Sequence, residues 1–256
     1  QPSPVPLYLG HQLISVYQEA DGKICLGFTT GEGGAVQVRT RHLILALGQS
    51  PLKKLAPVFP GFIRKLIDSV IPIPLIKCFF VVKDPWWDGT TRPQTRASSV
   101  PVRELHYYSR KEGGQRLGMV MVYGEKPSMN YWSPFVKNSV HLKAELNQND
   151  LLVDRYNKYL APAPEAGHSS EASGQDESVI SYGIRDWSKD PFEAGCHIWK
   201  PGVKVEKAIK EMTGFDLSGS SAEQKTVHIC GEAYSDVQGF IEGGLRTAYL
   251  VVNQID

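Results

Sequence analysis

The segment that most constrains the fold is residues 226–255, TVHICGEAYSDVQGFIEGGLRTAYLVVNQI. A short apolar run precedes a turn at Gly231, and a helical pattern of apolar residues begins near Gly239 and continues to Val252. A strand, a glycine turn and a helix N-terminus in this order offer free backbone N–H groups at the positive end of a helix dipole. The segment therefore predicts a place that holds a phosphate or an electron-rich carbonyl oxygen.

The beginning of the chain is rich in strands. Apolar and polar residues alternate in three stretches separated by glycine turns, which predicts an antiparallel meander over residues 7–18, 24–30 and 35–40. Residues 41–48, RHLILALG, predict a strand that is buried on both faces and enters a different, larger sheet. Residues 51–65 predict turns and a short helix, because prolines interrupt an otherwise weak pattern.

The middle of the chain alternates between strand and helix signals. Residues 71–87 form a β-prone run, and residues 105–124 predict a hairpin that turns at Gly113 and Gly114. Apolar residues at helical intervals predict one or two helices over residues 136–160, with an interruption near 147–150. Residues 161–178 contain no aliphatic residue larger than alanine, so we expect a flexible surface insertion there, with His168 in solvent.

Charge and cysteine usage exclude several classes of function. The 28 basic and 27 acidic residues leave a net charge of +1, which argues against nucleic-acid or anionic-membrane binding, and no apolar run reaches the length of a membrane span. Cys25, Cys78 and Cys230 lie in apolar segments and are expected to be buried, whereas Cys196 lies among small and polar residues. No spacing suggests a metal site or a disulfide framework. The chain begins at Gln1 without a signal peptide, so we expect a segment upstream and a cytoplasmic or organellar location rather than secretion.

Three separated motifs resemble the flavin-containing amine oxidases, the family of monoamine, polyamine and L-amino-acid oxidases. The first motif is PLIKCFFVVKDPWW at residues 74–87, a strand that carries a lysine and ends in a Pro-Trp-Trp turn. The second is RDWSKDPFEAGCHIWKPG at residues 185–202, and the third is CGEAYSDVQGFIEGGLRTA at residues 230–248. Their order along the chain matches the C-terminal half of the family.

The resemblance implies an α+β or α/β fold, the C-terminal part of a two-domain FAD-dependent amine oxidase with a mixed substrate-domain sheet and a flavin-binding strand, turn and helix. In these terms residues 1–50 supply a meander and a buried strand that joins the FAD domain. Residues 51–200 form the substrate domain with the insertion at 161–178, and residues 201–256 form the C-terminal flavin-binding part.

One departure from the family is the absence of the GxGxxG unit that approaches the FAD pyrophosphate. Gly31 to Gly34 is the nearest match, but it lies in a hairpin turn. The resemblance therefore implies that this chain supplies the C-terminal half of the active site, and that another chain or a missing segment carries the GxGxxG unit.

Lys77 is the candidate catalytic residue. By resemblance it holds a water next to the flavin N5 and assists imine hydrolysis or reoxidation by oxygen. A lysine inside PLIKCFFVV is also unusual in itself, since burial of an unpaired ammonium is costly. The alternative is an edge-strand lysine that points to solvent.

The resemblance also assigns residues around the substrate and the cofactor. Four side chains would line the substrate side: Trp187, His197, Trp199 and Phe240. Phe240 and His197 occupy the positions of an aromatic pair in relatives. His197 therefore either brings a titratable group to the substrate or only fills space and bonds a carbonyl.

Contacts to the cofactor would come from Cys196, Gly231, Glu232, Gly239, Phe240 and Ile241. In this assignment the Gly231 and Glu232 amides face the pyrophosphate, and the Ile241 amide faces the pyrimidine O2. Close helix packing is the alternative explanation for Gly239, Gly243 and Gly244.

Two features disagree about the branch of the family. Cys196 matches the position where monoamine oxidases bond FAD covalently, whereas the spacing from Gly231 to Gly239 is closer to that of the amino-acid oxidases. The spacing favours the amino-acid oxidases, in which the arginine for the substrate carboxylate would lie in the missing half.

The expected activity is oxidation of an amine or L-amino acid to an imine, which hydrolyses to an aldehyde or keto acid and ammonia, with oxygen reduced to hydrogen peroxide. The competing hypothesis is a non-catalytic relative that serves as a structural subunit of a larger complex.

Overall fold

The computed structural model of the chain describes residues 5–83, 85, 87, 94–96, 101–136, 140–143, 150–160, 179–189, 192–219 and 225–255. The predicted insertion at 161–178, with His168, and the tryptophan at position 86 lie outside these residues. The chain divides into two compact units, which are described separately. Unit 1 consists of Gln1–Pro72 and Cys196–Asp256, and unit 2 of Ile73–Gly195.

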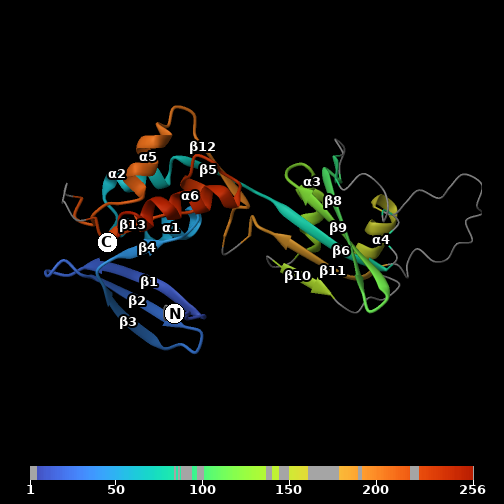
Figure 1. Cartoon of the computed structure of the whole chain (residues 1–256), viewed down its shortest axis with the longest axis horizontal. Helices are drawn as coiled ribbons and strands as arrows, with labels where there is room; N and C mark the ends of the chain where they lie inside the picture. Colours follow the sequence, from blue (N-terminus) through green and yellow to red (C-terminus); the bar gives the residue numbers. More distant parts are fainter. Residues whose placement is uncertain are drawn as a thin grey trace, which may run out of the picture. The chain divides into compact units, whose positions relative to one another are not determined.

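Unit 1 begins with an antiparallel meander in the order β1 (His11–Gln18), β2 (Ile24–Thr30) and β3 (Ala35–Thr40), coloured blue in Figure 1. The turns between these strands contain Gly22 at φ +83° and Gly33 at φ +81°, a backbone conformation that glycine adopts without steric strain. The predicted meander is confirmed.

A second sheet of unit 1 joins the two ends of the chain. In it β4 (Leu43–Leu45) pairs in parallel with β13 (Val227–Ile229). Leu43 and Leu45 are buried, but Ile44 is 48% exposed. The expectation that both faces are buried is not met, because no described residue of unit 1 covers Ile44, and the sheet has two strands among the described residues. The place of this strand in a larger sheet stays a prediction.

The helices of unit 1 surround this pair of strands. They are α1 (Gln49–Leu55), the short 3₁₀ turn η1 (Ala56–Val58), α2 (Gly61–Ile67), α5 (Val205–Met212), the 3₁₀ turn η3 (Glu232–Tyr234) and α6 (Ile241–Val252). Leu52 of α1, Ile63 of α2 and Met212 of α5 are buried in one cluster with Leu45 and Ile229. The sequence assigned residues 51–72 to the substrate domain, whereas α1 and α2 share the core of unit 1 because their apolar residues pack on its strands.

Unit 2 is built on one six-stranded sheet. Its order is β10 (Val140–Lys143), β11 (Val179–Asp186), β6 (Ile76–Lys83), β9 (Gln115–Gly124), β8 (Glu104–Glu112) and β7 (Gln94–Arg96). Every neighbouring pair is antiparallel, whereas the sequence analysis expected mixed pairing. A separate two-stranded pairing joins β5 (Val70–Ile73) to β12 (Cys196–Trp199), at the two places where the chain passes between the units.

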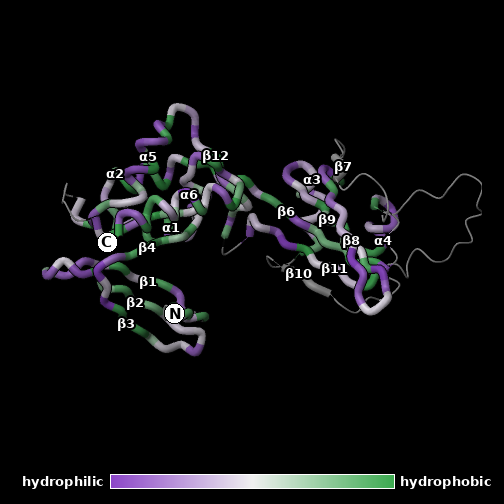
Figure 2. The backbone as a smooth tube through the Cα atoms, viewed as in Figure 1, coloured by the Kyte–Doolittle hydropathy of each residue, from purple (hydrophilic) through white to green (hydrophobic). Residues whose placement is uncertain are grey.

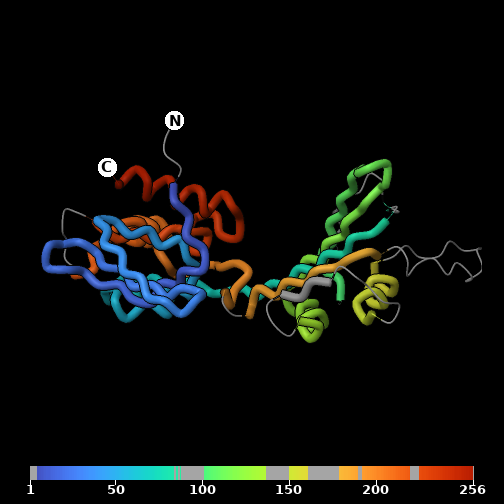
Figure 3. Tube along the Cα trace, turned by 90° about the horizontal axis from the view of Figure 1, so that it is seen from below, coloured from blue at the N-terminus to red at the C-terminus, as the bar shows by residue number. Residues whose placement is uncertain are grey.

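The predicted hairpin is confirmed as β8 and β9. Gly113 at φ +55° and Gly114 at φ +81° form its two-residue turn, the conformation that a twisted hairpin requires. Pairing with β6 ends at Lys83 opposite Leu117, so the hairpin extends beyond β6, as Figure 3 shows.

The core of unit 2 lies on one face of β6. Ile76, Cys78, Phe80 and Val82 are buried and alternate with less buried residues, and Figure 2 colours most of this strand hydrophobic. Short helices cover this core: α3 (Ser128–Trp132), the 3₁₀ turn η2 (Ser133–Phe135) and α4 (Leu151–Tyr159).

The prediction of helix over residues 136–160 is correct only for its second part. Asp150 caps α4 by accepting a hydrogen bond from the Leu152 amide at 3.0 Å. Residues 140–143 instead form the strand β10, because they pair with the edge of β11, and this tertiary pairing overrides the local helical spacing. No helix in the described part of the chain is both long and apolar enough to cross a membrane.

His228 is a fully buried titratable side chain in the centre of unit 1. Its Nδ1 lies 2.8 Å from the Thr213 carbonyl oxygen, and its Nε2 lies 3.3 Å from Nδ1 of His42. The pKa of His228 is lowered mainly by burial, with additional contributions from His42 and Lys225. Folding therefore favours its neutral form.

We predict that this histidine makes unit 1 less stable in acid. Because the unfolded chain binds a proton to His228 more readily, the free energy of unfolding falls as the pH drops below about 6.5. A His228→Asn variant retains a donor for the Thr213 carbonyl but does not titrate, so its unfolding free energy should depend less on pH. Urea unfolding at several values between about pH 5 and pH 8 measures how the unfolding free energy depends on pH. Equal slopes for the parent protein and the variant would refute the assignment of this pH dependence to His228.

Candidate functional site

The turn after β13 adopts a conformation that only glycine tolerates. Gly231 has φ +137° and ψ 168°, and it connects β13 to η3. Its amide donates to the Thr247 hydroxyl at 2.9 Å, so unit 1 itself uses the Gly231 amide that the sequence assigned to a ligand. The amide of Glu232 is the next along the turn, and a Cβ on Gly244 would stand 3.9 Å in front of it. Gly244 therefore leaves open space next to the Glu232 amide.

The N-terminus of α6 lies after this turn. Phe240 is its N-cap residue, and no side chain caps the helix among the described residues. Gly243 cannot carry a Cβ, because that atom would collide with the Val237 carbonyl and the Ser235 side chain. Close packing thus explains Gly243, whereas Gly239 has φ +82° and serves a turn. The Ile241 amide stands in the first turn of an uncapped helix, as expected for a site that binds an anion or a carbonyl oxygen.

A pair of side chains, a buried histidine and a half-buried glutamate, connects β12 to this turn. Oε1 of Glu232 lies 2.7 Å from Nδ1 of His197, and its Oε2 accepts from the Gly239 amide at 2.8 Å. His197 is 5% exposed, and its Nε2 is buried without a hydrogen-bond partner in the described part of the chain. A carboxylate at Nδ1 favours the tautomer that leaves Nε2 as an acceptor. The pair therefore presents one buried acceptor that lacks a donor.

The other two predicted residues of β12 lie beside the same turn. Cys196 is a half-buried thiol that forms no disulfide with a described residue, and a Cβ on Gly239 would lie 3.7 Å from its Cβ. The indole N–H of Trp199 donates to the Ser235 carbonyl at 2.8 Å, and its ring packs edge-on against Tyr234. Trp199 thus has a packing role in unit 1, and its contact with substrate stays a prediction.

Lys77 belongs to unit 2 and lies on the face of β6 opposite the core. β6 pairs with β11 on one side and β9 on the other, so the alternative of an edge-strand lysine is wrong. Lys77 is half-buried, its Nζ lies 5.3 Å from the ring centre of Tyr123, and it makes no ion pair with a described residue.

Trp187 also belongs to unit 2, immediately after β11. The guanidinium of Arg185 stacks on Trp187 at 4.6 Å and on Phe192 at 5.1 Å, and Arg185 is the residue opposite Lys77 in the sheet. The Nε of Arg185 is buried without a hydrogen-bond partner among the described residues. Lys77 and Trp187 therefore both neighbour Arg185 in unit 2: Lys77 is its partner in the sheet, and Trp187 stacks on its guanidinium.

The remaining predicted residues all lie in unit 1, around the turn after β13: Cys196, His197, Trp199, Gly231, Glu232, Gly239, Phe240 and Ile241. A glycine turn and a helix N-terminus at the carboxyl ends of parallel strands form an arrangement in which nucleotide-type cofactors commonly bind.

Comparison with known proteins identifies the family. Residues 1–256 match the family described as flavin-containing amine oxidoreductase, and the chain belongs to it. The predicted family and the C-terminal amine oxidase fold are confirmed, and the family's cofactor is the predicted FAD.

Solved structures of amine oxidases share the fold. Wild-type putrescine oxidase bound to putrescine has a TM-score of 0.63 and 13% identity, with 96% of this chain and 48% of that chain covered. A triple mutant of putrescine oxidase has a TM-score of 0.60 and 15% identity, over 96% of this chain and 49% of that one. Cyclohexylamine oxidase from Brevibacterium oxydans IH-35A has a TM-score of 0.57 and 15% identity, over 94% and 48%. The chain thus spans about half the length of these structures.

The turn in unit 1 fits a flavin nucleotide. A Cβ at position 244 would lie 3.9 Å from the Glu232 amide, and the buried Nε2 of His197 has no donor among the described residues. Such a space and such an acceptor match the phosphate oxygens and the N–H groups of a bound cofactor or substrate.

Sequence reasoning missed two features of the site. It assigned a role only to the backbone amide of Glu232, although the Glu232 carboxylate is hydrogen-bonded to His197. It also did not single out Arg185. Arg185 lies in the second motif, RDW, two residues before Trp187, but a stacked arginine has no signature in a single sequence.

We predict that Glu232→Gln destabilises unit 1, because one of its two bonds, to His197 Nδ1–H or to the Gly239 N–H, meets a donor amide instead of an acceptor oxygen. The expected loss in unfolding free energy is about 1–3 kcal/mol. Glu242→Gln on exposed α6 is the matched control and should change stability by less than about 0.5 kcal/mol. Equal stability of the two variants in urea unfolding would show that the Glu232 bridge is not formed.

Proposed function

We propose that this chain supplies the C-terminal half of the active site of an FAD-dependent oxidase that converts an amine or L-amino acid to an imine, with oxygen reduced to hydrogen peroxide. The observation that carries the proposal is the glycine turn after β13, with open space next to the Glu232 amide, beside the buried His197 acceptor. When bound, the flavin accepts the two electrons of the substrate. The Glu232 and Ile241 amides, with Gly239 and Phe240 between them, would hold the cofactor.

The role of His197 in this proposal follows from its hydrogen bonds. An amine must lose its extra proton before oxidation, and a neutral imidazole nitrogen that is held by a carboxylate can accept that proton or an N–H bond. His197 Nε2 is buried, oriented through Glu232 and without a partner in unit 1. This favours a role at the substrate over the alternative that the ring only fills space.

The substrate side of unit 2 would contain Lys77, Trp187 and Arg185. Lys77 would hold a water for imine hydrolysis or oxygen reduction, as the family resemblance implies. Arg185 has no carboxylate partner in the described part of unit 2, and guanidinium groups bind carboxylates with two parallel hydrogen bonds. Arg185 therefore supports an L-amino acid as substrate, whereas the structural neighbours, cyclohexylamine oxidase and putrescine oxidase, support simple amines.

A second polypeptide segment that carries a GxGxxG unit would complete the cofactor site. The exposed side of α6 is apolar, with Ile241 83% exposed, Leu245 62% and Tyr249 69%, and Ile44 of β4 is exposed as well. Apolar surface of this kind is typical of a contact face. The half-length match to amine oxidase structures supports the same interpretation.

The first test is the visible absorption spectrum of the native protein, before and after acid precipitation. We expect flavin absorption in the native protein. If the FAD is bound non-covalently, as the spacing from Gly231 to Gly239 favours, acid should release the colour into the supernatant. Colour in the pellet that disappears in a Cys196→Ala variant would instead establish a thioether to Cys196. Absence of flavin from the native assembly would contradict the proposed function and favour the structural-subunit hypothesis.

The second test is Lys77→Met. We expect turnover of the native assembly to fall by about 100-fold or more with folding retained, because the strand keeps an apolar side chain while the water-binding amine is lost. Lys83→Met, an exposed lysine at the end of the same strand, is the control and should leave turnover unchanged. Peroxide release with cyclohexylamine, putrescine and a panel of L-amino acids measures the effect. Unchanged turnover in Lys77→Met would exclude the catalytic role.

A further inference from the structure

A cavity of about 810 Å³ lies in unit 1 at the opposite end of the β4 and β13 pair from the glycine turn. Arg41 and His42 precede β4, and Lys225 and Thr226 precede β13, so the cavity opens at the amino ends of both parallel strands. Gly231 and Glu232 follow the carboxyl end of β13. The cavity is therefore separate from the proposed flavin site within unit 1.

Positive charge dominates the walls of this cavity. Its lining residues are Asp21, Gly22, Lys23, Arg41, His42, Lys210, Lys225, Thr226, Asn253 and Gln254. Arg41, Lys210 and Lys225 form no ion pair with any described residue, although the whole chain carries a net charge of only +1. Like charges held around one hollow repel one another and attract anions.

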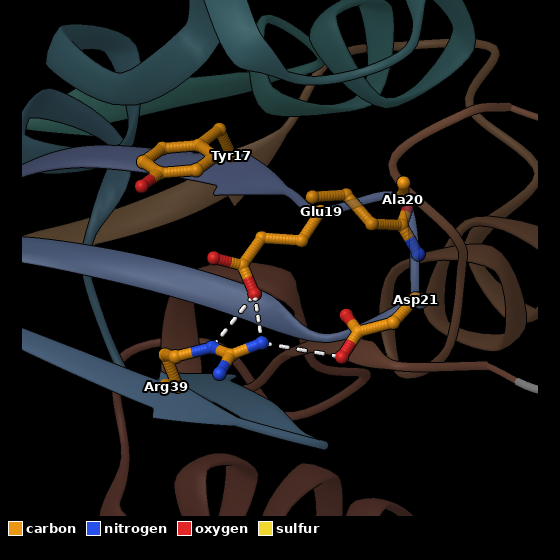
Figure 4. A pocket seen from close by; sticks show the side chains of 6 residues that line it. Tyr17, Glu19, Ala20, Asp21 and Arg39 are labelled. Carbon is orange, nitrogen blue, oxygen red and sulfur yellow. Dashed lines mark hydrogen bonds and ion pairs between the residues drawn. The ribbon is translucent and has the colours of Figure 1, made fainter.

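The one acidic residue among the described residues of the cavity is already neutralised. Asp21 lies 3.2 Å from Lys23 Nζ and 3.2 Å from Arg39, and Arg39 also binds Glu19, as Figure 4 shows. Asp21 therefore does not balance Arg41, Lys210 and Lys225.

His42 lines the cavity and is paired with the buried His228 behind it. The Thr213 carbonyl fixes the proton of His228 on Nδ1, so its Nε2 accepts from Nδ1–H of His42, which is 3.3 Å away. Burial lowers the pKa of His228, and His42 and Lys225 add smaller contributions in the same direction. His42 is the histidine of the pair that lines the cavity, and it reports on any charge that enters.

We propose that this cavity binds a small molecule that carries two or more negative charges on phosphate groups. Arginine and lysine together suit phosphate, because the guanidinium gives two parallel hydrogen bonds and the ammonium groups give point charges. The size of the cavity suits a phosphorylated metabolite rather than a polymer. The site is independent of the proposed flavin site.

The test is isothermal titration calorimetry of the purified protein with inorganic pyrophosphate, with citrate as a polycarboxylate of similar charge. We expect saturable pyrophosphate binding that weakens with added salt, and at least about 10-fold weaker binding by an Arg41→Gln/Lys225→Gln double variant. Lys210→Gln serves as a second variant if the double variant does not fold.

The control matched to Lys210→Gln is Lys207→Gln, because both variants remove one positive charge from α5. Lys207 lies outside the cavity, and its Nζ is 3.6 Å from Glu211. Pyrophosphate binding by Lys207→Gln should stay within about 2-fold of the parent protein. Pyrophosphate should also shift the NMR signals of His42 and leave those of His106 in unit 2 unchanged.

Three results would overturn the proposal. Absence of pyrophosphate binding would mean that the cations only stabilise the nearby C-terminus of α6. Equal weakening by Lys207→Gln would show a nonspecific charge effect, and tighter binding of citrate would exclude phosphate as the preferred group.

Discussion

The parallel pairing of β4 with β13 is the interaction on which the rest of unit 1 depends. It joins Leu43–Leu45, near the beginning of the chain, to Val227–Ile229, near its end. Two adjacent parallel strands need a crossover connection, and here the crossover contains the whole of unit 2. The turn at Gly231 begins where this pairing ends, so the position of the Glu232 amide depends on the pairing of these two segments.

Side chains then attach β12 to that turn. Glu232 bonds His197, while Gln238 accepts from the Trp199 amide at 2.7 Å and donates to the Ala233 carbonyl at 2.6 Å. The strand that carries Cys196 and His197 is thus fixed to the same loop that presents the Glu232 amide. Because β12 starts where the chain leaves unit 2, the second passage between the units is anchored directly at the candidate cofactor site.

Local patterns predicted the parts of the fold that local interactions determine. The hairpin followed from Gly113 and Gly114, and the helix α6 from its apolar spacing after a glycine turn. Residues 140–143 were assigned wrongly, because pairing with β11 decided their conformation, and Ile44 was expected to be buried because a single sequence does not show which layer covers a strand.

The candidate site divides in the same way. The glycines and the uncapped helix start could be predicted, since their backbone needs are encoded locally. The bond between His197 and Glu232 joins residues 35 positions apart in sequence, and the use of the Gly231 amide by Thr247 depends on how α6 packs. Neither has a local signal. The two ends of one strand pair also have opposite character: the Glu232 amide, a half-buried carboxylate and an imidazole lie at the carboxyl end, and cations without an ion pair to any described residue lie at the amino end. Because the strands separate these ends, the proposed cofactor site and the proposed anion site would occupy different places in unit 1.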